Sequence, residues 1–307
     1  MIAMKILMLA LCFVAAMASA SRGEEPPPSP ERIRQMAELV NKPVVYSVPG
    51  MDQVQVRKDL VYKRTDDPNV RMDIYTPPGL AAGEKRPAVI FIHGGAPTQF
   101  RPKEWGFFQS WGRLVAASGM VGVTFTYRQG YPQTTTLDSA SDVAEAIAWV
   151  RANAGDLGVD EDRLGLIAYS GGGPMLSPFL RGVPEHLRCI VGLYVFMDIR
   201  QSEAFRTSET EETLRRFSPI VQISEGKGRF TPLFLAQGGK DEIPTLKDSV
   251  ERFVAEALVR GVPLTFLFHP DAPHAFDNQL ADDRTREIVR GAVEFMKWHL
   301  GLTPRTS

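Results

Sequence analysis

The chain has 307 residues, of which 44% are hydrophobic and 23% are charged, and its formal net charge is −1. This length and apolar content are enough for one large α/β domain with a substantial core. A nearly neutral chain offers no electrostatic case for binding nucleic acid, so we expect no such partner.

The first twenty residues have the features of a targeting segment. Lys5 precedes an apolar run over residues 6–17, and Ala18-Ser19-Ala20 supplies the small residues of a cleavage site. The run is too short for a bilayer, which needs about 20 apolar residues. We therefore expect residues 1–20 to be a signal peptide cleaved after Ala20, giving a secreted or periplasmic protein with no remaining membrane span. An uncleaved anchor is the alternative.

Residues 21–43 are expected to be a linker followed by a short helix, ahead of a single domain over residues 44–307. The stretch 21–30 is polar and proline-rich, which is typical of a flexible linker. Ser29 suits a helix N-cap and Pro30 the first helical position. An apolar face then recurs at helical spacing, through Ile33, Met36, Ala37 and Val40.

The next segments predict a mostly parallel mixed sheet. Residues 54–64 and 70–76 alternate like two half-buried strands around a turn at 66–69, which indicates an antiparallel hairpin. Unbroken apolar runs follow, as expected for parallel strands buried on both faces; they cover residues 88–92, 121–125, 164–168, 189–195, 233–236 and 264–268. Helical patterns alternate with them, near residues 105–118, 138–153, 172–180, 245–260 and 283–300.

This alternation predicts an α/β fold with helices on both faces of the sheet. One connection is longer than the others. Residues 198–230 include a helical stretch near residues 209–217 and could form a small lid or one wall of a pocket.

Ser170 is the first candidate for chemistry. It follows an apolar strand pattern and lies between Ala168 and Gly172, which matches a nucleophile elbow with alanine in place of the usual first glycine. Such a turn exposes a serine hydroxyl, and the N–H of Gly171 would point toward a developing oxyanion. The alternative is an ordinary glycine-rich turn.

A second candidate loop follows residues 88–92. The strand runs directly into His93, Gly94 and Gly95, and glycines after a buried strand let backbone N–H groups approach a ligand closely. The N–H of Gly95 or of Ala96 is expected to be the second oxyanion donor. We expect His93 to fix this loop by hydrogen bonding rather than to act as a base.

Asp241 is the favoured acid, because it comes after the strand at 231–237 and the glycine pair Gly238-Gly239. A carboxylate there could hold an imidazole in its useful tautomer. Asp198, after an earlier strand, and Asp271, close to the candidate histidine, are the alternatives.

His274 is the favoured base. It follows the last strand, in a loop that Pro270 and Pro273 stiffen. His269 is the competitor, but it adjoins the strand and is expected to pack against the core. No H-E-x-x-H or C-x-x-C spacing is present, so no metal and no cofactor is expected.

With these residues in place, the chain resembles the α/β-hydrolase superfamily over residues 54–302. It looks most like the esterase and lipase-like branches that carry an H-G-G oxyanion loop, near the dienelactone hydrolases and prolyl-oligopeptidase-type peptidases. The resemblance implies that Ser170 is the nucleophile, His274 the base and Asp241 the orienting acid. It also implies an oxyanion hole made by Gly171 and the 94–96 loop.

The resemblance implies a serine hydrolase that cleaves small carboxylic esters through an acyl-enzyme. A peptidase or amidase with the same triad is the second interpretation. The third is a non-catalytic binding protein with the hydrolase fold, which Ala168 and Ala96 slightly favour. The natural substrate and the oligomeric state stay open.

Overall fold

The computed structural model describes residues 30–96, 98–129, 134–181, 184–243 and 245–302. The expected signal peptide, residues 1–20, and the linker up to Ser29 lie outside the described residues. None of the described helices is long and apolar enough to cross a bilayer.

The described residues form an eight-stranded sheet in the order β1-β2-β4-β3-β5-β6-β7-β8. β1 and β2 form the antiparallel hairpin, β2 is also antiparallel to β4, and the remaining neighbours are parallel. The mostly parallel mixed sheet is therefore confirmed. The strands are β1 (Gln55–Leu60), β2 (Met72–Thr76), β3 (Arg86–Ile92), β4 (Val121–Phe125), β5 (Val159–Tyr169), β6 (Leu187–Leu193), β7 (Leu233–Gly238) and β8 (Leu264–His269).

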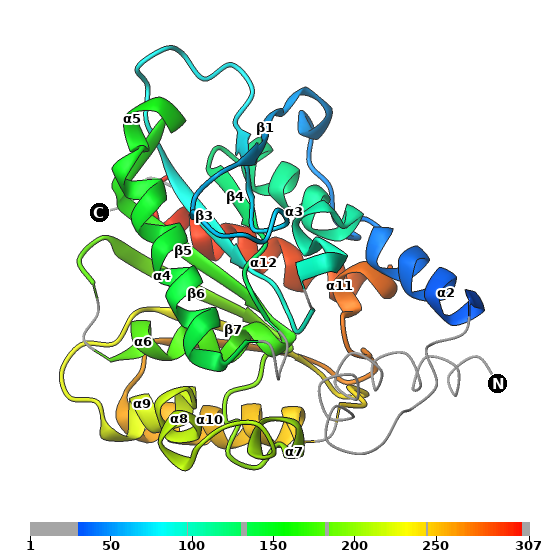
Figure 1. Ribbon diagram of the computed structural model, residues 1–307, viewed down its shortest axis with the longest axis vertical. Helices are drawn as coiled ribbons and strands as arrows, with labels where there is room; N and C mark the ends of the chain where they lie inside the picture. The colour runs from blue at the N-terminus through cyan, green and yellow to red at the C-terminus, as the bar shows by residue number, and fades with distance from the viewer. Residues whose placement is uncertain (1–29, 97, 130–133, 182–183, 244, 303–307) are drawn as a thin grey trace.

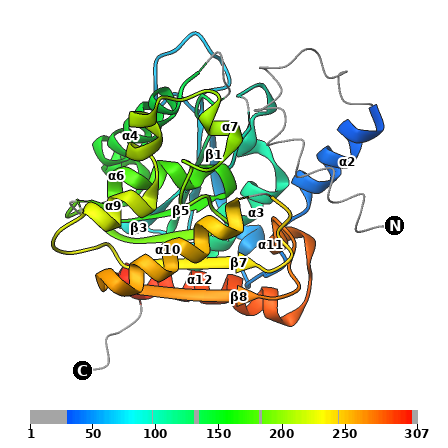
Figure 2. The same cartoon turned by 90° about the horizontal axis from the view of Figure 1, so that it is seen from below.

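Helices cover both faces of this sheet (Figures 1 and 2). One face packs against α4 (Thr136–Ala152), α6 (Ser177–Leu180) and α10 (Leu246–Arg260), and the other against α3 (Gly106–Ala117) and α12 (Asp283–His299). The other helices are α2 (Pro30–Asn41), α5 (Ala154–Leu157), α7 (Glu203–Arg206), α8 (Glu211–Arg216), α9 (Pro219–Glu225) and α11 (Phe276–Gln279), with 3-10 turns at Met51–Gln53, Thr98–Phe100, Pro102–Glu104 and Ser170–Leu176.

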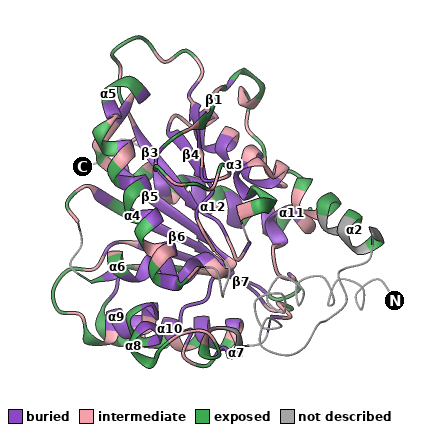
Figure 3. Cartoon of the chain, viewed as in Figure 1, coloured by how far each residue is buried: buried purple, intermediate pink, exposed green. Residues whose placement is uncertain are grey.

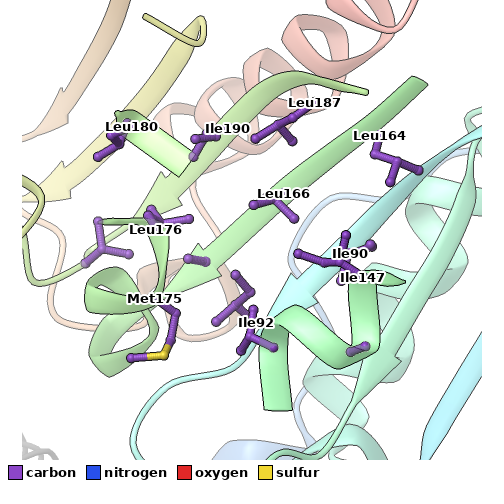
Figure 4. Packing of buried hydrophobic residues seen from close by; sticks show 14 of the residues in the cluster. Ile90, Ile92, Ile147, Leu164, Leu166, Met175, Leu176, Leu180, Leu187 and Ile190 are labelled. Carbon is purple, nitrogen blue, oxygen red and sulfur yellow. The ribbon is translucent and has the colours of Figure 1, made fainter. Parts of the chain in front are cut away.

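Alternate residues of the central strands point to opposite faces, as the period of a strand requires. Ile90 and Ile92 of β3 pack with Ile147 of α4, and Figure 4 shows these side chains beside Leu164 and Leu166 of β5. Val89 and Phe91 belong to the cluster beneath α3 and α12 on the opposite face. Burying a side chain such as Ile90 contributes about 2 kcal/mol. Figure 3 shows the strands buried and the outer helix surfaces exposed.

Capping side chains fix several helix starts. Thr135 and Asp138 form a reciprocal capping box at the start of α4. Thr210 caps α8, and Asp282 caps α12 by accepting from the Thr285 N–H. Gly261, in the left-handed region, ends α10.

Two local predictions differ from the structure. The helix expected over residues 172–180 is instead the 3-10 turn η5 (Ser170–Leu176) followed by the short α6. Pro174 and Pro178 lack the N–H that a regular α-helix needs. The first strand ends at Leu60 rather than near residue 64, since its register shifts around Asp59, which has a positive φ of 59°.

The helix expected near Pro30 is present as α2, and its C-terminal end docks on the domain. The Asn41 side chain accepts a hydrogen bond from the Gly106 N–H at 3.1 Å, and the Asn278 amide donates to the Leu39 carbonyl at 3.0 Å. Of the residues on the expected apolar face whose burial is described, Val40 is half-buried and Ala37 is exposed.

Candidate active site

Four loops meet where parallel strands end. His93 follows β3, Ser170 follows β5, Asp241 comes three residues after β7, and His274 lies in the loop after β8. Because these strands run in the same direction in one sheet, their carboxyl ends lie along one edge. Segments far apart in the sequence are thus brought together there.

Ser170 occupies the sharp turn between β5 and η5. Its φ of +49° lies in the left-handed region that non-glycine residues rarely adopt. The turn requires small neighbours, because a methyl group on Gly172 would lie 2.7 Å from the carbonyl oxygens of Ile92 and His93. Ala168 is fully buried and pairs with Ile92 and Gly192 in the sheet, so alanine is compatible with this turn.

Ser170, His274 and Asp241 form a continuous hydrogen-bonded chain. His274 Nε2 lies 2.9 Å from Ser170 Oγ, and His274 Nδ1 lies 2.9 Å from Asp241 Oδ2. Asp241 is itself oriented, since it accepts from the Gln237 side chain and the Ile243 N–H, both at 3.1 Å. The Asp241 side chain is fully buried. This arrangement lets a hydroxyl pass its proton to an imidazole that a carboxylate holds in place.

The charges around His274 favour its protonated form. Burial alone lowers the pKa of His274, but the neighbouring carboxylates, Asp241 first and then Glu242 and Asp277, outweigh it and raise the pKa above 6.5. Glu242 also accepts a hydrogen bond from the His274 backbone N–H at 3.3 Å. An imidazolium formed during a reaction would therefore be stabilised.

The two alternative acids have other partners. Asp198 is fully buried and binds the Arg200 guanidinium through both oxygens at 2.9 Å, and it also accepts from Ser218. Asp271 pairs with Lys240 at 2.6 Å on the surface. Neither contacts His274, whereas Asp241 does.

His269, the alternative base, ends β8 and is buried. Its Nε2 lies 3.0 Å from Asp282 at the start of α12. It makes no hydrogen bond to Ser170 among the described residues.

His93 holds the loop after β3. Its Nδ1 lies 2.7 Å from the Gly94 carbonyl, which can only accept, so this nitrogen carries the proton. Nε2 then accepts from the Tyr127 N–H at 3.4 Å, and the two rings stack 4.0 Å apart. Burial lowers the pKa of His93 to about 4, so the ring is neutral near pH 7. These contacts fit a loop-fixing residue better than a base.

The loop after β3 lies close to the elbow. The backbone at Gly171 lies so close to the loop that a methyl group on it would be 2.9 Å from the Gly95 nitrogen. Gly171 is the second residue of η5, where no preceding helical turn offers its N–H a carbonyl. The N–H of Ala96, in contrast, donates to Gln129 Oε1 at 2.9 Å. Of the two amides that the sequence left open, that of Ala96 thus already has an acceptor in this structure, and the role of either amide as an oxyanion donor stays a prediction.

Sequence reasoning missed the side chains that support this loop. Tyr127 donates to the His93 carbonyl at 2.8 Å, and the Gln129 amide donates to the Tyr127 hydroxyl at 2.6 Å. Both follow β4 at the same edge of the sheet. That position was the available signal, although neither residue belongs to a recognisable motif.

The connection over residues 198–230 forms α7, α8 and α9. Phe205 of α7 packs edge-on against Phe196, and the Phe196 N–H donates to the Ser170 carbonyl at 3.1 Å. The segment therefore abuts the elbow from one side, and its role as a lid stays a prediction.

Comparison with known proteins gives a consistent set of relatives. A family model described as BD-FAE matches residues 72–186. Esterase LipQ of Mycobacterium tuberculosis is 26% identical, covering 73% of this chain and 58% of that protein. Isoprenylcysteine alpha-carbonyl methylesterase ICME of Arabidopsis thaliana is 27% identical, covering 75% and 61% respectively. The chain thus spans about three fifths of the length of these two curated relatives.

Solved structures share the fold. A thermophilic esterase from Thermogutta terrifontis has a TM-score of 0.64 and 22% identity, covering 84% of this chain and 97% of that one. Esterase B from Lactobacillus rhamnosis has a TM-score of 0.68 and 14% identity, covering 98% and 96% respectively. At these identities the likeness concerns the fold alone.

Proposed function

We propose that this chain, which belongs to the α/β-hydrolase superfamily, hydrolyses carboxylic esters through an acyl-enzyme on Ser170. The observation that carries the proposal is the hydrogen-bonded chain from Ser170 through His274 to Asp241 at the carboxyl ends of the strands. The curated relatives support it, because the two described above are named as esterases.

The proposed reaction has two stages. Ser170 Oγ attacks the ester carbonyl carbon while His274 Nε2 takes the hydroxyl proton, and the oxyanion accepts hydrogen bonds from the N–H groups of Gly171 and Gly95. His274 then gives its proton to the departing alcohol. In the second stage His274 takes a proton from a water molecule, whose oxygen attacks the acyl carbon; the bond from that carbon to Ser170 Oγ then breaks, His274 returns the proton to Oγ, and the acid is released. Asp241 keeps the Nδ1 proton in place throughout.

Turnover of an activated short-chain ester tests the proposal. The purified protein should hydrolyse it, and Ser170→Ala should reduce kcat at least ~10⁴-fold. Ser141→Ala is the matched control and should keep full activity, since Ser141 is exposed on α4 and donates to Glu145 on the same helix. Turnover that survives in Ser170→Ala would exclude Ser170 as the nucleophile.

The same experiment separates the two other interpretations. A fluorophosphonate probe should label the wild-type protein and fail to label Ser170→Ala. A folded protein that is neither labelled nor active would favour a non-catalytic binding role. Faster turnover of amide or peptide substrates than of esters would favour a peptidase. A panel of esters with varied acyl and alcohol groups then defines the substrate.

We also propose that the protein is exported, on the basis of Lys5, the apolar run over residues 6–17 and the Ala18-Ser19-Ala20 site. N-terminal sequencing after expression in a bacterial host should give a mature chain that starts at Ser21. A chain that retains Met1 in a membrane fraction would indicate an uncleaved anchor instead.

A further inference from the structure

Asp277 is a buried carboxylate to which the proposed reaction gives no role. It lies three residues after His274 and is fully buried. Its two oxygens accept from different donors: the Trp111 indole N–H reaches Oδ2 at 2.9 Å, and the Tyr194 hydroxyl reaches Oδ1 at 2.8 Å. No lysine or arginine among the described residues pairs with it.

Tyr194 connects this carboxylate to the imidazole. Its ring meets the His274 ring edge-on, with centroids 4.8 Å apart and an interplanar angle of 69°. Tyr194 directly follows β6 and has a positive φ of 42°, which is uncommon for an aromatic residue. Backbone strain of this kind persists only where the surroundings over-determine the conformation. The Asp277 hydrogen bond is one of the constraints on this side chain.

Several titratable groups face Asp277. Tyr194 contacts it directly, burial and the nearby Asp277 carboxylate raise the pKa of Tyr169 of β5, and His274 lies just before α11, the helix that carries Asp277. Burial raises the pKa of Asp277 to about 6, against the opposing effect of its hydrogen bonds and of His274. The carboxylate therefore ionises below the pH at which a neutral histidine acts as a base.

The two oxygens of Asp277 accept from Trp111 and from Tyr194, and the indole N–H can only donate. An asparagine would keep the bond to Trp111 through its oxygen, and it would keep the bond to Tyr194 only with the hydroxyl turned to accept from its amide. A buried carboxylate without a cationic partner is costly, so a neutral group of the same shape would be favoured if the position served packing alone.

We propose that Asp277 is a positioning residue for His274: it holds the Tyr194 ring against the imidazole and places a second negative charge behind it. The inference rests on the proposed role of His274 as the base. Asp241 orients the imidazole through its Nδ1 proton, whereas Asp277 constrains the ring from the Tyr194 side. Both carboxylates favour the imidazolium that forms when Ser170 loses its proton.

Titration of the histidines tests this without relying on turnover. The chain has five histidines, so a sample with ¹³C-labelled imidazoles gives few signals, and the His274 signal is identified by its loss in His274→Asn. In Asp277→Asn the midpoint of the His274 titration should fall by about 0.5 to 1 pH unit. Asp271→Asn is the matched control, because Asp271 lies in the same loop but is exposed and paired with Lys240. In Asp271→Asn the midpoint of the His274 titration should equal that of the wild type.

Kinetics give the second measurement. Asp277→Asn should lower kcat about 10-fold and leave KM within twofold, because the change acts on the base and not on substrate binding. Tyr194→Phe keeps the Asp277 carboxylate but removes the hydrogen bond from the Tyr194 hydroxyl to it. This variant should lower kcat, and it should change the midpoint of the His274 titration less than Asp277→Asn does. An unchanged midpoint and kcat in Asp277→Asn would overturn the proposal.

If Asp277→Asn does not fold, Tyr194→Phe decides, and full kcat in that variant overturns the proposal. A wild-type protein that hydrolyses no ester would instead contradict the proposed function. In that case the titration midpoints still measure the link between Asp277 and His274.

Discussion

The N–H of Ala96 donates a hydrogen bond to the side chain of Gln129 at 2.9 Å. This bond joins the loop after β3 to the loop after β4, and Tyr127 extends the link to the His93 carbonyl. The position of the Gly95 N–H therefore depends on side chains that never touch the Ser170 hydroxyl among the described residues.

Gln129→Ala should lower kcat/KM about 10-fold, because the loop that carries the Gly95 N–H loses its brace and the oxyanion donor is less well placed. Steady-state kinetics on an activated ester check this. Gln129→Glu keeps an acceptor for the Ala96 N–H and should retain more activity. Wild-type kcat/KM in Gln129→Ala would show that the loop holds its position alone.

The activity should fall on acidification with a midpoint above pH 6.5. Only neutral His274 can accept the Ser170 proton, and its pKa is raised by Asp241, Glu242 and Asp277 against the effect of burial. The loss therefore begins at a higher pH than for an ordinary histidine. A profile of kcat/KM from pH 5 to 9 measures the midpoint.

Glu242→Gln refines that test. Removing this negative charge should move the acidic limb of the profile to lower pH, because the imidazolium loses one of its stabilising neighbours. Glu185→Gln, outside the site, is the control and should leave the profile in place. A limb that moves to higher pH in Glu242→Gln would contradict the electrostatic account.

Gly173→Ala should impair folding or strongly destabilise the protein. A methyl group there would overlap the carbonyl oxygen of Phe196, which is backbone and cannot move aside cheaply. Gly155→Ala is the matched control, since nothing lies within 4 Å of the added carbon. Thermal unfolding of both variants checks this, and equal midpoints would show that the elbow adapts.

Lys103→Met should reduce the free energy of unfolding by about 3 to 5 kcal/mol. Lys103 is 1% exposed and binds Asp59 at 2.7 Å and the equally buried Asp73 at 3.0 Å, so its loss leaves a buried carboxylate without a cation. Urea unfolding measures the change. Lys85→Met, which breaks an exposed pair with Glu161, should leave the midpoint nearly unchanged. Similar urea midpoints of unfolding for Lys103→Met and Lys85→Met would contradict the prediction.

The strands could be predicted from the sequence wherever apolar residues form an unbroken run. Each unbroken apolar run became a strand of the sheet, and the central strands are buried on both faces, which leaves little choice of residue. The expectation of full burial was wrong for β8, which is the edge strand and is only partly buried. The three candidate residues Ser170, Asp241 and His274 were found by their place after strands, and the structure brings them within hydrogen-bonding distance.

The supporting residues could not be predicted in the same way. Trp111 and Asp277 are 166 residues apart, and their hydrogen bond follows no local spacing. Asp277 lies three residues after His274 in the sequence, but the neighbouring residues give no sign that Trp111 and Tyr194 will bury it. Pro174 and Pro178, within the helix expected over residues 172–180, were local signals that the sequence interpretation did not use.

The docking of α2 has a consequence for how the protein acquires activity. Leu39 and Asn278 are 239 residues apart, and the Val45 N–H donates to the carbonyl of Asp277 itself. The short helix α11, which directly follows the loop of His274, is thus held by the first segment that the structure describes. Contacts of such long sequence separation form late, since loop closure is slow and entropically costly. During refolding, the return of hydrolysis should therefore lag behind the return of helical circular dichroism, which makes catalysis a sensitive reporter of the last step of assembly.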